Sequence, residues 1–139
     1  MNNITIEGIG WDGDLFLLKV TAQAKSAWAK TEVYVSDISD LANMFLSYPD
    51  PKGSDFYWAI SETAKVERDL SFKIIPKDKL GHLMVEVYMT IKDHKTSENH
   101  HAVFCVQTEI GMLNSFGKRL EAINKPIESV KVSLAETEQ

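Results

Sequence analysis

Apolar and polar residues alternate over several short stretches of this chain, as they do in strands with one buried face. This pattern predicts strands over residues 4–9, 15–22, 28–35, 56–61, 70–76, 80–92 and 101–108, with a further short strand or ordered tail over 127–134. The stretch 15–22 is apolar on both faces, which predicts a central position in a sheet. The stretch 56–61 has the weakest pattern, and residues 62–68 fit either a loop or the start of the next strand.

Two other segments carry apolar residues at helical spacing. Ile38, Leu41, Ala42 and Phe45 share one helical face, and the short polar pair 36–37 before them predicts a capped helix start. We expect this helix to end near residue 47, because two prolines follow closely. The second helix is predicted over 109–124, capped by Thr108 and stopped by Pro126. Its apolar stripe comprises Ile110, Leu113, Phe116, Leu120 and Ile123.

Together these elements predict the α+β class, with a single mostly antiparallel, curved sheet of about six or seven strands and two helices packed on one face. The other face of the sheet would then be open to solvent or to a partner. We expect one domain over residues 1–134, followed by a frayed tail over 135–139.

Composition narrows the classes of function. The 139 residues include 20 Asp and Glu against 15 Lys and Arg, for a net charge of −5. This balance argues against a nucleic-acid binder, which usually carries a basic stripe. No apolar run approaches the roughly 20 residues that span a bilayer, so no membrane partner is expected. Since no signal peptide is apparent at the start of the chain, we expect a cytoplasmic protein.

The sequence contains histidine and cysteine residues, which often bind metals or act in catalysis, but their spacing does not predict a metal site or an active site. His100 and His101 are adjacent in a predicted strand and therefore point to opposite faces. His94 could approach His100 across a hairpin loop, but zinc would need further ligands. The lone cysteine, Cys105, is expected to be a buried and inert thiol. We therefore predict no catalytic residue, no metal site and no cofactor, and a protein that is not an enzyme.

The outward sheet positions are a better candidate for function. Trp28, Glu32 and Tyr34 share one face of a strand, and His82, Glu86 and Tyr88 could lie on the same side of the sheet. Aromatic residues interleaved with carboxylates suit a protein interface. The alternative is a solvated sheet face covered by large amphipathic side chains, or aromatic rings tucked under the loop between Tyr48 and Trp58.

The order of these elements resembles the WapI-like immunity proteins of bacterial polymorphic-toxin systems. The resemblance spans about residues 4 to 125 and is carried by EVYVSDISDL at 32–41, LSFKII at 70–75, LGHLMVEV at 80–87 and HAVFCVQTEIGML at 101–113. Its sharpest element is the step Gly81-His82-Leu83 that opens the longest strand. The resemblance implies a small cytoplasmic protein that neutralises a cognate toxin domain by binding it directly.

Many toxin domains are basic nucleases, and the acidic balance of this chain would suit such a partner. Two other interpretations stay open. The first is a non-enzymatic α+β module that binds a ligand or oligomerises, since the edge strands of an open sheet can pair into a homodimer. The second is an enzyme with a site near residues 49–56 or 93–100.

Overall fold

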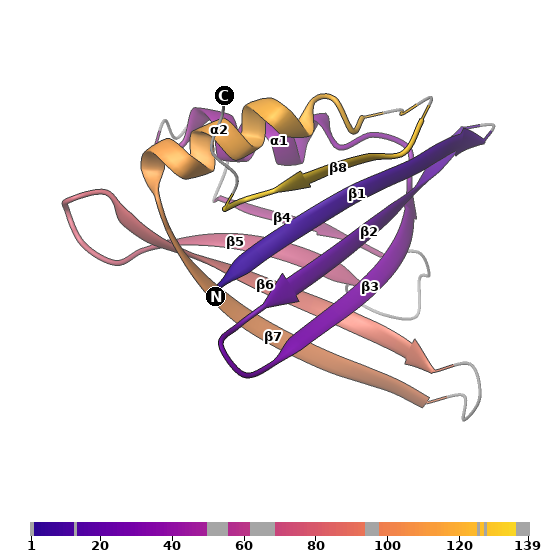
Figure 1. Ribbon diagram of the computed structural model, residues 1–139, viewed down its shortest axis with the longest axis horizontal. Helices are drawn as coiled ribbons and strands as arrows, with labels where there is room; N and C mark the ends of the chain where they lie inside the picture. The colour runs from indigo at the N-terminus through magenta and orange to yellow at the C-terminus, as the bar shows by residue number, and fades with distance from the viewer. Residues whose placement is uncertain are drawn as a thin grey trace.

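The computed structural model describes residues 2–12, 14–49, 56–61, 69–93, 98–124, 126 and 128–135. Within these ranges it contains, in chain order, β1 (Asn3–Asp12), β2 (Leu15–Gln23), β3 (Trp28–Val35), α1 (Ser39–Ser47), β4 (Tyr57–Ile60), β5 (Leu70–Pro76), β6 (His82–Asp93), β7 (Glu98–Glu109), α2 (Ile110–Leu120) and β8 (Val130–Ser133). Figure 1 shows their arrangement. The α+β class is therefore confirmed.

The described strands form two four-stranded antiparallel sheets, so the prediction of one sheet is wrong. The first sheet has the order β3-β2-β1-β8 and the second has the order β4-β5-β6-β7. In Figure 1 the first sheet lies in front of the second. Alternation along a strand indicates which side chains are buried, but it does not say which strand is the neighbour. Here the chain leaves the first sheet after β3, builds the second, and returns at its end to pair β8 with β1.

The apolar faces of the two sheets pack against each other and form one core. Phe16, Leu18 and Val20 of β2 are buried, as are Val85 and Val87 of β6. β2 is hydrogen-bonded to β1 and to β3, which confirms the central position predicted for residues 15–22.

A buried hydrogen bond joins the two layers directly. The hydroxyl Oγ1 of buried Thr31 on β3 donates to the main-chain oxygen of Thr90 on β6 at 2.7 Å.

The two helices bridge the sheets instead of covering one sheet face. α1 contacts β4 of the second sheet, and α2 contacts both β8 of the first and β7 of the second. Figure 1 shows the helices lying together along the upper side of both layers. Under them, Phe45 of α1 meets Phe116 of α2 with ring centroids 5.6 Å apart, and it meets Phe72 of β5 edge-on at 5.8 Å. This buried aromatic cluster joins both helices to the second sheet.

Two asparagine side chains form hydrogen bonds with main-chain groups at the two ends of α1. Asn114 belongs to α2, and Asn124 belongs to the turn after it. At the start of α1, Asn124 accepts a hydrogen bond from the amide of Ile38 at 3.0 Å and donates to Ser39 Oγ at 3.1 Å. At its end, Asn114 Nδ2 donates to the main-chain oxygens of Phe45 and Tyr48 at 2.8 and 3.1 Å. The predicted polar pair 36–37 also contributes, because Asp37 Oδ1 accepts a hydrogen bond from the amide of Ser39 at 2.6 Å.

The helices approach most closely at Gly117 of α2. A Cβ atom added there would lie 2.7 Å from the main-chain oxygen of Ala42 and would also collide with the amide nitrogen of Leu46. These are backbone atoms of α1, which cannot move aside as the end of a flexible side chain can. A residue without a side chain is therefore required at this crossing.

Several predicted boundaries shift. β6 begins at His82 and not at residue 80, because Gly81 adopts a φ of 93° that ends the turn. α2 ends at Leu120 and not at residue 124. Its N-cap is Glu109 and not Thr108, whose hydroxyl is buried without a hydrogen-bond partner among the described residues. The ambiguous segment 62–68, His94 and the tail at 136–139 lie outside the described residues.

Replacing Gly117 with alanine should destabilise the fold. The added methyl would collide with the backbone of α1, and overpacking of this kind costs about 1–3 kcal/mol. Urea unfolding followed by circular dichroism measures the change in the free energy of unfolding. The matched control is Gly111→Ala in the same helix, where no described atom lies within 4 Å of the added methyl and where alanine should be neutral or stabilising by up to about 1 kcal/mol. Equal effects at both positions would contradict the close crossing.

Asn124→Ala should also destabilise the protein, because it removes the acceptor for the first free amide of α1. Loss of a helix cap costs about 1 kcal/mol, and the additional hydrogen bond to Ser39 should increase that value. Asn43→Ala is the control, since Asn43 lies on the exposed side of α1 and surface changes are usually within about 0.5 kcal/mol. An unfolding midpoint that moves no more for Asn124→Ala than for the control would rule out the capping role.

Candidate binding surfaces

The six predicted interface residues do not form one surface. Trp28, Glu32 and Tyr34 lie on the outward face of β3 in the first sheet, while His82, Glu86 and Tyr88 belong to β6 in the second. The inward residues of both strands enter the same core, as the buried positions Val33 and Val87 show. The outward faces of the two sheets therefore point away from each other, and the expectation of a common side is wrong.

The outward face of the first sheet carries charges of alternating sign. Across the strands, Glu32 of β3 is opposite Lys19 of β2, which is opposite Glu7 of β1, which is opposite Lys131 of β8. Lys19 Nζ lies 3.8 Å from the Glu32 carboxylate. The row is balanced overall, and it gives Glu32 a structural role in cross-strand pairing. Trp28 lies at the end of this face and is 67% exposed.

The outward face of the second sheet has fewer charges. We call it the second-sheet face, and it comprises Tyr57, Ala59, Lys73, Ile75, Met84, Glu86, Tyr88, Val103 and Cys105, which occupy cross-strand neighbour positions on β4, β5, β6 and β7. Glu86 is opposite Lys73 on one side and Cys105 on the other. Glu86 makes no ion pair with any other described residue.

Tyr88 is part of a second cluster on this face. Its hydroxyl lies 2.6 Å from Nδ1 of His101 on β7, and the two rings stack with centroids 5.6 Å apart. This contact holds the ring of Tyr88 beside that of His101 on the sheet surface.

Sequence reasoning did not single out several apolar side chains that are exposed in the described part of the chain. Val103 on β7 is 57% exposed, Tyr57 on β4 is 44% exposed, and Leu80 in the turn before β6 is 84% exposed. The sequence does carry a signal for Val103, because it alternates with the inward residues Ala102 and Phe104. Leu80 lies in a turn and not in the predicted strand. Cys105 is exposed, so the expectation of a buried thiol is wrong.

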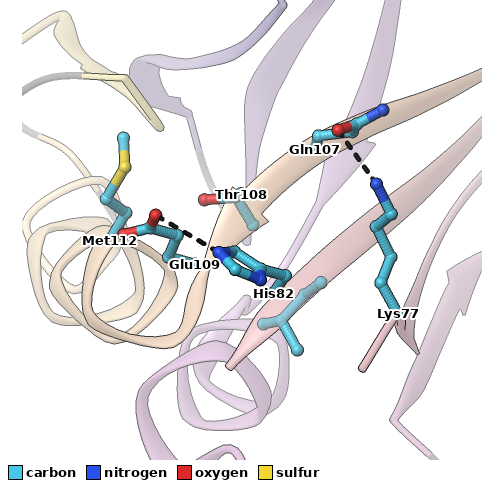
Figure 2. A pocket seen from close by; sticks show the side chains of 7 residues that line it. Lys77, His82, Gln107, Thr108, Glu109 and Met112 are labelled. Atoms are coloured by element: carbon cyan, nitrogen blue, oxygen red, sulfur yellow. Dashed lines mark hydrogen bonds and ion pairs between the residues drawn. The ribbon is translucent and has the colours of Figure 1, made fainter. Parts of the chain in front are cut away.

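His82 lies on the same outward side of β6 as Glu86 and Tyr88, and it lines a cleft at the start of α2. The cleft has a volume of about 470 Å³ and is lined by Lys77, His82, Leu83, Gln107, Thr108, Glu109 and Met112. Figure 2 shows Lys77 and Gln107 on one side, joined by a hydrogen bond of 3.1 Å, with Glu109 and Met112 on the other. The imidazole of His82 lies between these two sides.

The turn that carries His82 is held by one carboxylate. Asp78 Oδ1 accepts hydrogen bonds from the amides of Leu80 and His82, and Asp78 Oδ2 lies 2.7 Å from His82 Nδ1. The main-chain oxygen of Gly81 then accepts from the amide of Ile110 at 3.1 Å, which ties the turn to the start of α2. The hydrogen bond from the His82 side chain is the main cause that lowers the pKa of Asp78 from its ordinary 3.8, and the Leu80 amide adds to it.

Within the described residues, no group of three or more His, Cys, Asp or Glu is arranged to hold a metal ion. None of the helices in these ranges has the length and apolar character needed to cross a membrane. Comparison of the chain with protein-family models, with curated proteins and with solved structures found no match.

The titration of Asp78 should depend on His82. In the wild type, its carboxyl should titrate below pH 3.8, and His82→Ala should raise that pKa part of the way back, because the two backbone hydrogen bonds remain. Because the pKa of Asp78 is lower in the folded state than in the unfolded state, its carboxylate stabilises the fold at pH values above the unfolded pKa. This stabilisation is lost as the pH falls through the folded pKa. NMR chemical shifts of the Asp78 carboxyl carbon, recorded against pH, measure this pKa in the wild type and in His82→Ala. An unchanged midpoint in His82→Ala would refute the assignment of the cause.

Proposed function

We propose that this chain is an immunity-type protein that neutralises a cognate bacterial toxin domain by binding it directly. The resemblance to WapI-like immunity proteins supports the class of function. The fold is compatible with it, because the helices lie along one side of both layers and exposed side chains such as Trp28 and Val103 remain on the outward sides of the two sheets. Binding needs no reacting group, and inhibition would follow from covering the toxin's substrate site.

We place the contact on the second-sheet face, and one observation carries this choice. Around Glu86, this face presents aromatic and aliphatic side chains, including Tyr57, Tyr88 and Val103. Its other charged residue is Lys73, the cross-strand neighbour of Glu86. Interface centres are typically depleted in charge and enriched in tyrosine and methionine. The carboxylate of Glu86 lies among them without an ion pair to another described residue. A toxin domain that offers a lysine or arginine there, surrounded by apolar groups, would match it.

The first-sheet face is the weaker candidate. Its carboxylate Glu32 already lies 3.8 Å from Lys19, and Lys30 is next to it on the same side of β3. A basic partner would therefore meet lysines as well as the carboxylate, which reduces the attraction. Trp28 and Tyr34 are exposed, but they lie at separate positions along β3.

The alternative function is a non-enzymatic module that binds a ligand or oligomerises. The feature that favours it is β7, a strand of 12 residues at the edge of the second sheet. An edge strand of this length can pair with a strand of another copy. Sedimentation of the purified chain over a range of concentrations would separate a monomer from such an assembly.

Co-expression with the toxic domain encoded beside this chain's gene tests the proposal. Expression of the domain alone should stop growth, and co-expression of this chain should restore it through a complex that co-purifies. If the neighbouring reading frame encodes no toxic domain, or if growth is not restored, the immunity function is refuted.

Charge reversal locates the contact. Glu86→Lys should weaken toxin binding by tenfold or more, because losing a charge-assisted pair at an interface costs about 2 kcal/mol or more. The matched change Glu32→Lys should leave the affinity nearly unchanged. Titration calorimetry at two salt concentrations measures both, and a larger effect at Glu32 than at Glu86 would move the site to the first sheet.

A further inference from the structure

β7 is an edge strand, and one side of its main chain is met by no other described strand. In the second sheet β7 pairs with β6 alone, and Figure 1 shows it along the lower border of that sheet. The amide of Ile110 donates to the main-chain oxygen of Gly81, which continues the ladder between the two strands. Every second residue of β7 before Ile110 therefore forms its main-chain hydrogen bonds with β6. The amides and carbonyls of the odd-numbered residues point away from β6.

The side chains along this open edge are mostly apolar. The free main-chain groups include those of Val103 and Cys105, whose side chains are exposed on the outward face. On the inward face Ala102 and Phe104 are only partly buried, although they pack against the core. The strand contains no proline and no lysine. An edge of this composition is open to pairing with another strand.

The other edges of the two described sheets are shorter or charged. β4 and β8 have four residues each, against 12 in β7. On β3, the hydrogen bond from the amide of Ala24 to the oxygen of Ala27 directs the odd-numbered residues to β2. Its free positions therefore include Lys30 and Glu32, and charged side chains at an edge oppose pairing. β7 is the longest edge and the one with least protection of this kind.

The apolar run of β7 is complementary to itself. Residues 101–107 read HAVFCVQ, with Phe104 at the centre. In an antiparallel pair of two copies with the twofold axis at Phe104, Val103 lies opposite Cys105, and His101 lies opposite Gln107. Apolar groups then meet apolar groups, and the opposed residues are those with free amides and carbonyls. An axis at residue 103 would instead place His101 opposite Cys105, and an axis at residue 105 would place Val103 opposite Gln107.

The charges at the ends of the strand fit the same pairing. With the axis at Phe104, Glu109 of one copy lies opposite residue 99 of the other and diagonal to its His101. Diagonal neighbours are within reach of long side chains, and opposite charges there favour the pair. The contact occurs twice because of the symmetry, and it is attractive when the imidazole is protonated. Both the apolar run and these ends therefore suit a second copy of the chain.

We propose that β7 of one chain pairs antiparallel with β7 of a second copy around a twofold axis at Phe104. The four-stranded second sheets of the two copies then join into one continuous sheet. This inference specifies the partner and the register of the edge that favours the alternative function. It does not require a toxin, so dimerisation and toxin binding can fail separately.

Sedimentation equilibrium over a range of concentrations tests the interface. We expect a monomer–dimer equilibrium, and Val103→Pro should weaken dimerisation about tenfold or more, because the symmetric pair loses two hydrogen bonds. This proline removes an amide that points away from β6, so the fold should be kept. Val103→Lys keeps the amide, and its edge charge should also weaken dimerisation. The matched control is Lys30→Pro, which removes a free amide of β3 and should leave dimerisation unchanged.

Circular dichroism establishes that each variant is folded. A chain that stays monomeric at its highest soluble concentration would overturn the proposal. So would a dimer that Val103→Lys leaves intact, or one that Lys30→Pro alone disrupts.

Cysteine cross-linking tests the register. A chain with Val103→Cys and Cys105→Ser is mixed with the wild type, in which Cys105 is the one cysteine. In the proposed pair the new thiol lies opposite Cys105 at a Cα separation of about 5.5 Å, which a disulfide can bridge. Identical positions are diagonal and about 7–8 Å apart. Mild oxidation should therefore give about tenfold more linked dimer in the mixture than in either chain alone.

The unmixed chains distinguish the other registers. Efficient linking of the Val103→Cys, Cys105→Ser chain by itself would place the axis at residue 103. Efficient linking of the wild type by itself would place it at residue 105. Either result would overturn the pairing centred on Phe104.

Discussion

The close crossing of α1 and α2 at Gly117 is the constraint on which the arrangement of this protein depends. The helices can approach so far only because Gly117 has no side chain against the backbone of Ala42 and Leu46. This approach brings Asn114 within reach of the last carbonyls of α1, and Asn124 within reach of its first amide. The helix pair thus joins β4 and β7 of the second sheet to β8 of the first.

This bridging position determines which surfaces remain for recognition. If both helices had covered one sheet, that sheet would have had no free face. They lie along one side of the two layers instead, so each sheet keeps an outward face with a different composition. The first sheet carries a balanced row of charges that pair with one another. The second-sheet face carries aromatic and aliphatic groups around Glu86, and this difference is the basis of the proposal that a partner binds there.

The start of α2 is the point where the helix pair meets the longest hairpin. Asp78 orders the turn by accepting two amides and the imidazole of His82. The main-chain oxygen of Gly81 in this turn accepts a hydrogen bond from the amide of Ile110, the first residue of α2. The same set of contacts leaves His82 Nε2 and Glu109 facing each other without a hydrogen bond.

The sequence alone determined the α+β class, both helices and nearly all strands to within a few residues, because burial periodicity is a local property. It also identified Glu86 and Tyr88 as outward residues of β6. It could not decide that the strands divide into two sheets, because alternation does not encode the neighbouring strand. For that reason the sequence pattern wrongly predicts Glu32 and Glu86 on one side. Only the tertiary structure placed Lys19 beside Glu32 and Asn124 at the start of α1, since those contacts join residues far apart in the chain.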